Sequence, residues 1–256
     1  MLYGRNENIM RRLWAVVLVL NLALTAAACG STEEASQEKS IIVDPSRKGE
    51  PDPTEANVGD VITFGSYEQD NDLSDGAEPI EWIVLDRLQD GELFLISKYA
   101  LDCRPFHTAR VSVSWTTCDL KKWLNSTFLH MAFSQDEIDR IVPPQIEGRD
   151  ASASETGGEE EKEDRVFLLS TLEARTLFPE ETKGYSELRV CEPTEYAKAQ
   201  GAWAFNDGSC KWWLRSFGDD TTNAAYVGLG GHIYNLGRIV SREDGAVRPA
   251  IIISVR

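Results

Sequence analysis

The first part of the folded region has a strand-like pattern of hydrophobic and polar residues. Residues 61–65 and 79–85 are rich in β-branched and aromatic side chains, which are typical of strands. Residues 93–96 form a third apolar run, and the Asp90-Gly91 pair before it favours a hairpin turn. The pattern therefore predicts a β-meander, in which consecutive strands pair with each other.

The middle of the chain has helical spacing. Apolar residues recur three and four positions apart in the set Leu120, Trp123, Leu124, Phe128 and Leu129. Thr116 or Thr117 stands where a cap for this helix is expected. A short buried strand is predicted over 166–169, because a compact apolar run stands there between polar segments.

Capping residues predict three further helices. Ser134 with Glu137 and Ser170 with Glu173 form capping boxes, which predict helices over 135–142 and 171–178. Thr194 predicts the start of another helix, which Gly201 closes.

From Trp203 onward the pattern changes to short apolar pairs among Gly, Asn and aromatic residues, ending in a predicted strand over 250–255. The expected fold class is therefore α+β, with short antiparallel strands, a few helices and long loops.

The first 28 residues have the order of a lipoprotein signal peptide. Arg5, Arg11 and Arg12 precede an apolar run over 13–24, and three Ala residues lead to Cys29. The run is shorter than the ~20 residues that span a bilayer. The Cys after small residues resembles the bacterial lipobox, although Ala26 stands where that motif usually has Leu. The resemblance implies a diacylglycerol on Cys29. The alternatives are an ordinary secretory signal with a coincidental Cys and an uncleaved anchor.

The segment after Cys29 predicts a tether. Residues 29–57 are rich in Ser, Glu, Lys, Asp and Pro, and such a composition buries too little apolar surface to fold. Residues 58–256 are expected to form a single extracytoplasmic domain with an acidic surface loop over 147–165. The expected location is the extracytoplasmic face of the cell membrane, with the lipid on Cys29 as the membrane contact.

Charge and cysteine content bear on the class of partner and on the presence of disulfides. The formal net charge of −16 argues against nucleic acid as a partner, because phosphate backbones are repelled. Besides Cys29, the chain has four cysteines, Cys103, Cys118, Cys191 and Cys210. An even number in an exported chain suggests two disulfides. Of three possible pairings we favour the local ones, Cys103–Cys118 and Cys191–Cys210. The alternative is four free, buried thiols.

Several motifs resemble a large family of uncharacterised bacterial surface domains, a family of unknown function. They are CKWWLRS (210–216), NAAYV (223–227), GAVRPA (245–250), GDVITFGSYEQD (59–70), PIEWIVLD (79–86), LISKYALDC (95–103) and KKWLNSTFL (121–129). This resemblance implies no activity. The C-terminal motifs are also similar to the fold shared by formylglycine-generating enzymes, C-type-lectin-like domains and retroelement-diversified receptors. That second resemblance implies adjacent N- and C-terminal strands, two helices and a loop-rich ligand face.

The chain lacks the chemistry of the enzymes in that second group. Formylglycine-generating enzymes use a late pair of Cys to bind copper, and no Cys follows Cys210. His107, His130 and His232 lack the spacing of metal ligands. No metal or cofactor is expected. Calcium alone is left open, by the lectin-like triplets at 192–194 and 205–207 and by the acidic loop with Asp70, Asp72, Asp75 and Gly76.

The C-terminal loops contain the candidate ligand-binding residues: Trp203, Arg215, Asn223, Tyr226, His232, Tyr234 and Asn235. Aromatic faces beside Asn and Arg suit sugar rings or a protein partner. The alternative is that Tyr226 and Arg215 are buried structural residues. The favoured function is a membrane-anchored binding module for a glycan or protein ligand. An enzyme acting on the cell envelope, with acidic residues or His232 in its site, and a structural surface protein are the alternatives.

Overall fold

Two five-stranded sheets form the framework of this computed structural model, which describes residues 52–88, 91–144, 164–178 and 185–255. The chain divides into Met1–Glu38 and Lys39–Arg256, and every described residue lies in the second unit. The predicted signal peptide, Cys29 and residues 29–51 of the predicted tether lie outside the described residues. No helix in the described ranges is long and apolar enough to cross a bilayer.

The first sheet contains the predicted meander. Its strand order is β1 (Val61–Tyr67), β2 (Glu78–Leu88), β3 (Glu92–Ser97), β10 (Ala250–Ser254) and β5 (Val166–Phe167), with every neighbouring pair antiparallel. The last strand, β10, pairs with β3 and β5, and β2 and β3 separate it from β1. The expectation that the N- and C-terminal strands lie side by side is therefore wrong, because the meander places its third strand against β10.

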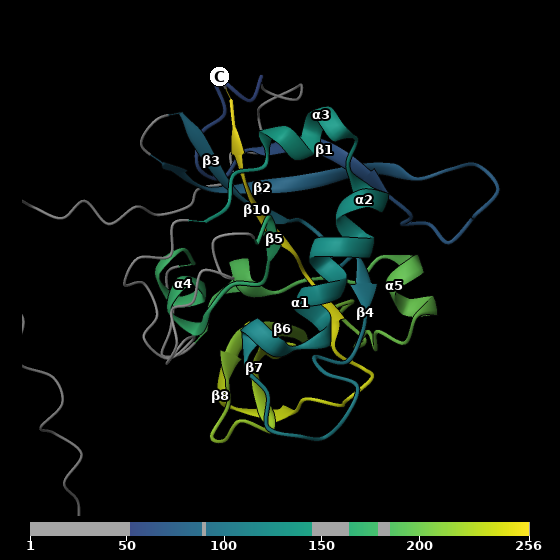
Figure 1. Cartoon of the computed structure of the whole chain (residues 1–256), viewed down its shortest axis with the longest axis vertical. Coiled ribbons are helices and arrows are strands. Elements are labelled where there is room, and N and C mark those ends of the chain that lie inside the picture. The colour runs from purple at the N-terminus through teal and green to yellow at the C-terminus, as the bar shows by residue number, and fades with distance from the viewer. Residues whose placement is uncertain (1–51, 89–90, 145–163, 179–184, 256) are drawn as a thin grey trace, which may run out of the picture. The chain divides into compact units, whose positions relative to one another are not determined.

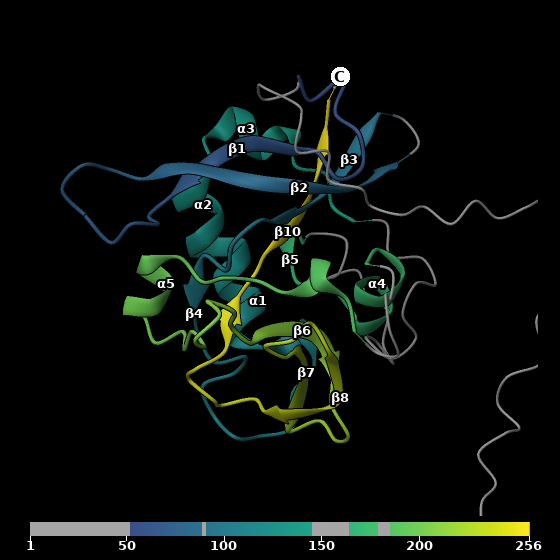
Figure 2. The same ribbon diagram turned by 180° about the vertical axis from the view of Figure 1, so that it is seen from behind.

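The second sheet is built mainly from the C-terminal part of the chain. Its order is β4 (Asp102–Cys103), β9 (Ala246–Val247), β6 (Trp212–Phe217), β7 (Asn223–Val227) and β8 (Ile233–Ile239). Strands β6 and β9 pair in parallel and the other neighbours are antiparallel. In Figures 1 and 2, β6, β7 and β8 lie together at the end of the domain opposite to β1 and β2. The helices and these two antiparallel-rich sheets place the domain in the α+β class.

One helical run packs against the first sheet. It passes from α1 (Asp119–Trp123) through a π-helical turn (Leu124–Phe128) into α2 (Leu129–Ala132). The Phe128 ring lies 5.0 Å from that of Tyr67, and the Phe133 ring 5.5 Å from that of Phe64. Of the apolar positions that the spacing assigned to one helix face, Trp123 is half-buried and the other four are buried.

The cap of α1 differs from the predicted one. Cys118 occupies the cap position, and its sulfur accepts a hydrogen bond from the Lys121 N–H at 3.3 Å. Thr116 and Thr117 belong instead to a 3₁₀ turn, Trp115–Thr117, that precedes the helix. The preference for a hydroxyl cap is weak enough that packing of the buried Cys118 decides the position where the helix starts.

The other capping residues act as predicted. Ser134 and Ser170 form capping boxes with Glu137 and Glu173 at the starts of α3 (Gln135–Arg140) and α4 (Thr171–Thr176). The Thr194 hydroxyl accepts a hydrogen bond from the Ala197 N–H at 3.0 Å and caps α5 (Glu195–Ala199). A further 3₁₀ turn, Glu187–Arg189, stands before α5.

The packed domain extends beyond two predicted boundaries. Ala56 is fully buried, and Arg87 donates hydrogen bonds to the carbonyls of Thr54 and Ala56, so the fold includes residues before 58. Asp164 is also buried: it accepts a hydrogen bond from Trp115 Nε1 at 2.9 Å and pairs with Lys121 at 3.1 Å. The predicted acidic loop therefore ends before 164, and its residues 147–163 lie outside the described part of the chain.

The four cysteines of the domain are buried free thiols, so neither predicted disulfide is formed in this structure. The sulfur of Cys103 donates to the Glu243 carbonyl at 3.1 Å, and that of Cys118 to the Trp115 carbonyl at 3.3 Å. The predicted Cys103–Cys118 pairing is corrected by this geometry, because the tertiary fold gives each sulfur its own backbone partner. The sulfur of Cys191 donates more distantly, to the Glu192 carbonyl at 3.6 Å and the Lys98 carbonyl at 3.8 Å, and the Cys210 N–H donates to the Cys191 carbonyl at 2.8 Å.

Candidate ligand-binding surface

An exposed pair of stacked rings stands out on the second sheet. Tyr226 on β7 and Tyr234 on β8 face each other across the strands, with ring centroids 4.8 Å apart and planes 2° from parallel. Tyr234 is 49% exposed, whereas Tyr226 is half-buried beneath it. We call these two rings the tyrosine platform. The exposed half of Tyr234 gives the platform aromatic surface in contact with solvent.

A charged side chain supports the platform from below. The guanidinium of Arg238 lies 5.5 Å from the Tyr226 ring and 5.4 Å from the ring of the fully buried Trp213. Arg238 also pairs with Asp244 at 2.5 Å. Burial acts to raise the pKa of Asp244, but hydrogen bonds from Arg238 and Arg242 outweigh it and hold the pKa far below the ordinary value. The platform therefore rests on a stack that is anchored in the core and fixed by an ion pair.

The β7–β8 turn is shaped to hold Tyr234 in place. The Gly228 N–H donates to the His232 carbonyl at 2.8 Å, which closes the turn. A Cβ on Gly228 would come within 2.4 Å of the Tyr234 ring. Only glycine leaves room for the ring to lie over the backbone at this point. Tyr234 is therefore positioned by the turn as well as by the ring beneath it.

Arg215 does not belong to the ligand surface, contrary to expectation. It is 2% exposed, and its two terminal nitrogens lie 2.5 and 3.0 Å from the carboxylate oxygens of Glu173. A third hydrogen bond runs to the Leu168 carbonyl at 2.8 Å. The terminal nitrogens of the guanidinium thus bind groups inside the protein. This confirms the alternative interpretation, in which Arg215 is a buried structural residue.

The other predicted ligand residues are spread over the domain. Asn223 is half-buried and donates to Asp219 at 2.7 Å. His232 is exposed, and its ring packs 5.5 Å from that of Tyr185. Asn235 is exposed directly after Tyr234, where the β7–β8 register is interrupted. Of the predicted set, the structure brings only Tyr226 and Tyr234 into one ring stack.

Trp203 belongs to a second exposed aromatic group. It is 53% exposed and packs at 5.7 Å, edge to face, against Phe205, which is 44% exposed. Lys211 lies 6.0 Å from the Trp203 ring. The pair lies on the loop between α5 and β6, so it provides an independent surface for comparison with the tyrosine platform.

The small cavity nearest to Arg215 and Asn223 is not a ligand pocket. Its volume of about 10 Å³ is room for roughly one water molecule. Besides those two side chains it is lined by Phe106, Val113, Ser114, Trp115 and Phe217. An organic ligand is therefore too large for this cavity.

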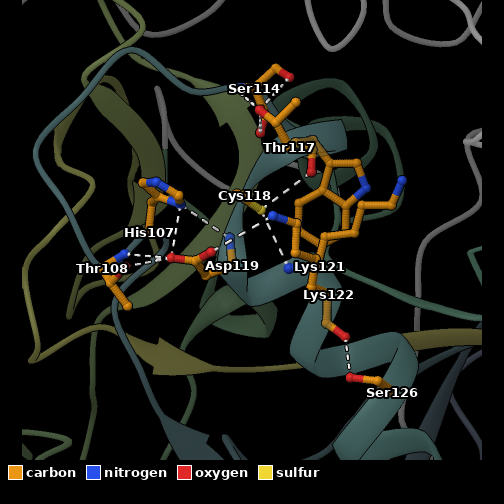
Figure 3. A network of polar contacts seen from close by, with 10 residues as sticks. His107, Thr108, Ser114, Thr117, Cys118, Asp119, Lys121, Lys122 and Ser126 are labelled. Carbon is orange, nitrogen blue, oxygen red and sulfur yellow. Dashed lines mark hydrogen bonds and ion pairs between the residues drawn. The ribbon is translucent and has the colours of Figure 1, made fainter.

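A polar network at the start of α1 contains residue types that catalyse nucleophilic reactions elsewhere (Figure 3). His107 Nδ1 lies 3.0 Å from the Asp119 carboxylate, which also accepts hydrogen bonds from the Thr108 N–H and hydroxyl. The adjacent Cys118 is fully buried, and burial raises the pKa of its thiol to about 12. The thiol is therefore protonated at neutral pH, and the network fastens residues 107–108 to the helix instead of activating a nucleophile.

An acidic cluster could hold a cation near the loop where calcium was considered. Oxygens of Glu68, Asp70 and Glu78 lie within 4.8 Å of one another. Burial and the charge of Glu78 raise the pKa of Glu68. The Glu78 carboxylate already accepts a hydrogen bond from the Gln69 N–H at 2.6 Å. Asp72, predicted as part of the same site, instead accepts hydrogen bonds from Ser74. The cluster differs from the predicted set, since only Asp70 is common to both.

Sequence reasoning missed Arg238 and Asp244, which complete the platform. Arg238 is opposite Ala224, and Tyr234 is opposite Tyr226, so β8 has two more residues than β7 over this stretch. This irregularity returns the Arg238 side chain to the Tyr226 ring. Alternation does place Arg238 on the same face as Tyr234, but a regular ladder would set it opposite residue 222, and no sequence pattern predicts the two extra residues that bring it opposite Ala224.

Together these features define the protein as an α+β domain with two antiparallel-rich sheets and an exposed aromatic surface on the second sheet. The chain belongs to the family described as "Domain of unknown function (DUF6273)", which matches residues 90–255. This agrees with the resemblance of its motifs to an uncharacterised family. Neither the curated proteins nor the solved structures yield a match to the chain.

Proposed function

We propose that this protein is a membrane-anchored, extracytoplasmic binding module and that the tyrosine platform holds its ligand. The observation that supports the proposal is the parallel Tyr226–Tyr234 stack, exposed at Tyr234 and supported by Arg238. A ring that is already fixed loses little conformational entropy when a ligand binds. This arrangement suits recognition of a flat partner.

A glycan is the ligand class that the platform favours. The C–H face of a sugar ring stacks on an aromatic face, and the sugar hydroxyls then reach the phenol groups and nearby polar side chains. The strongly acidic chain argues for a neutral or basic glycan over a polyanionic one. A protein partner with an exposed ring or proline is the alternative. A C-type-lectin relationship is not part of the proposal, since β1 and β10 are not adjacent.

Replacing Tyr234 with Ala tests the platform. We expect glycan affinity to fall about tenfold, corresponding to the loss of one stacking contact. The melting temperature should change little, because the side chain is half exposed. The measurement is a glycan array with the detergent-solubilised full chain, followed by calorimetric titration of the best ligand.

Trp203→Ala is the matched control, because it removes an aromatic side chain of similar exposure from a separate loop. The Trp203→Ala variant should bind the glycan with the same affinity as the unmodified protein. If Trp203→Ala loses binding while Tyr234→Ala keeps it, the platform is not the site. If no sugar binds but a protein partner is captured through Tyr234, the glycan class is wrong and the platform is retained.

The lipid anchor has its own test. Metabolic labelling with a fatty-acid probe should mark the full chain, and Cys29→Ser should abolish both the label and recovery in the membrane fraction, because Cys29 is the proposed thioether site. The matched control is Cys118→Ser, which should keep the label. Membrane recovery of an unlabelled Cys29→Ser chain would mean that an uncleaved hydrophobic segment is the anchor.

A further inference from the structure

Cys191 and Cys210 meet although 18 residues lie between them in the chain. The Cys210 N–H donates to the Cys191 carbonyl at 2.8 Å, so the two backbones are directly joined. Each of the two thiols also shifts the pKa of the other, so the two side chains are neighbours. This backbone contact holds the two Cα atoms close together, and a disulfide requires Cα atoms roughly 4.4–6.8 Å apart.

A buried cation stands beside the two sulfurs. Arg248 is 1% exposed and packs against Trp212 at 5.1 Å, and its Nε donates to the Ser97 carbonyl at 2.9 Å. One terminal nitrogen, Nη1, has no hydrogen-bond partner within the described residues, and no carboxylate in those ranges forms an ion pair with this guanidinium. The positive charge of Arg248 acts on both thiols.

The surroundings make the two thiols unequal. Burial acts to raise the pKa of Cys191, but the Cys210 thiol, the Arg248 charge and the Ala100 N–H hold it below the ordinary value. For Cys210, the hydrogen bond with Cys191 and burial raise the pKa well above the ordinary value. Of the two packed thiols, Cys191 is therefore the easier one to deprotonate and Cys210 the harder one.

We propose that Cys191 and Cys210 are oxidised to a disulfide as the chain folds outside the cytoplasm, whereas Cys103 and Cys118 stay as thiols. The structure described here is then the reduced form. The cross-link encloses residues 192–209, which carry α5 and the exposed Trp203–Phe205 pair. This inference concerns the stability of the domain and not the tyrosine platform, so it stands or falls independently of ligand binding.

The reaction needs an oxidant of the disulfide class. The Cys191 thiolate attacks one sulfur of the oxidant disulfide, which forms a mixed disulfide and releases one thiolate. Cys210 then loses its proton and attacks the Cys191 sulfur, which forms the protein disulfide and releases the second thiolate. Two protein thiols lose two electrons and two protons, and the oxidant is reduced to two thiols. Because both sulfurs are buried, the attack takes place before the 192–209 segment packs or while it opens locally.

The other two cysteines lack these features. Burial, with the neighbouring Asp102, raises the pKa of Cys103 to about 12, and burial raises that of Cys118 to about 12. Their sulfurs donate to the Glu243 and Trp115 carbonyls at 3.1 and 3.3 Å, closer contacts than the 3.6 and 3.8 Å that the Cys191 sulfur makes with backbone carbonyls. Neither thiol has a second sulfur as a hydrogen-bond partner among the contacts of the described residues, so oxidation is expected to be selective.

The test is refolding of the full chain in buffers of reduced and oxidised glutathione, followed by acid quenching, alkylation in denaturant and peptide mapping. We expect a single cross-linked species that is about 2 Da lighter, with the peptides of Cys191 and Cys210 joined and Cys103 and Cys118 alkylated. Reduction of the oxidised protein should lower its melting temperature by roughly 6–12 °C, the shift expected for a loop of this size in a domain of this length.

Two variants serve as matched controls. Cys210→Ser should prevent the cross-link and remove the difference in melting temperature between oxidised and reduced protein, and Cys118→Ser should preserve both. A cross-link from Cys103 to Cys118 or to Cys210, or alkylation of both Cys191 and Cys210 after refolding with oxidised glutathione, overturns the proposal. If Cys210→Ser does not fold, the peptide map of the unmodified chain still decides the pairing.

Discussion

Replacing Arg215 with Met is expected to destabilise the protein by about 3–5 kcal/mol. The substitution keeps the length of the side chain but removes its charge, which leaves the Glu173 carboxylate buried without its bidentate partner. The Leu168 carbonyl also loses a donor. Equilibrium urea unfolding of the full chain, followed by tryptophan fluorescence, measures the effect as a lower midpoint with an unchanged slope.

The exposed pair of Glu195 and Lys198 provides the control for Arg215. The two charges are 2.6 Å apart, but both side chains are more than a third exposed, so Glu195→Gln should cost less than about 1 kcal/mol. The double variant Arg215→Met with Glu173→Met should recover much of the loss, because no charge is then buried alone. Equal effects of Arg215→Met and Glu195→Gln would show that burial of the Arg215 pair does not matter.

Replacing Gly231 with Ala is expected to cost roughly 3 kcal/mol. Its φ of +73° is strained for any residue with a Cβ, and the added carbon would lie 2.1 Å from the Ser186 carbonyl oxygen. The Gly231 carbonyl also accepts a hydrogen bond from the buried Arg189 at 2.7 Å. A shift of this turn away from Ser186 therefore disturbs the core as well as the β7–β8 hairpin. Thermal melting and urea unfolding both measure the loss.

The neighbouring Gly230 is the matched control. It is exposed and its φ is not positive, and a Cβ there meets only the His232 ring at 3.4 Å. Gly230→Ala should change stability by less than about 0.5 kcal/mol. If Gly230→Ala is as destabilising as Gly231→Ala, the loss of stability in Gly231→Ala comes from the turn conformation and not from the contact with Ser186.

Much of the local structure could be predicted from neighbouring residues. The β-meander, the capping boxes at Ser134 and Ser170 and the Thr194 cap depend on contacts within a few positions, and the structure confirms each of them. The cap of α1 was wrong because Cys118 is selected by its burial in the core. Short-range preferences are worth about 1 kcal/mol, so packing can override them.

The candidate site was predicted less well. Tyr226 and Tyr234 were included for their chemistry, but so was Arg215, whose sequence neighbourhood looks equally suitable. What separates them is burial, and burial depends on Glu173, a residue 42 positions away. Arg238 was missed because a register irregularity brings it to the platform.

The sequence by itself determined the α+β class and most helix starts, because periodicity and capping act between residues that are near in the chain. Only the tertiary structure decided the place of β10 between β3 and β5, the burial of Arg215, the stack beneath Tyr234 and the meeting of Cys191 with Cys210. Each of these is a contact between distant segments. Its energy depends on which surfaces the whole chain buries together, and no local pattern encodes that choice.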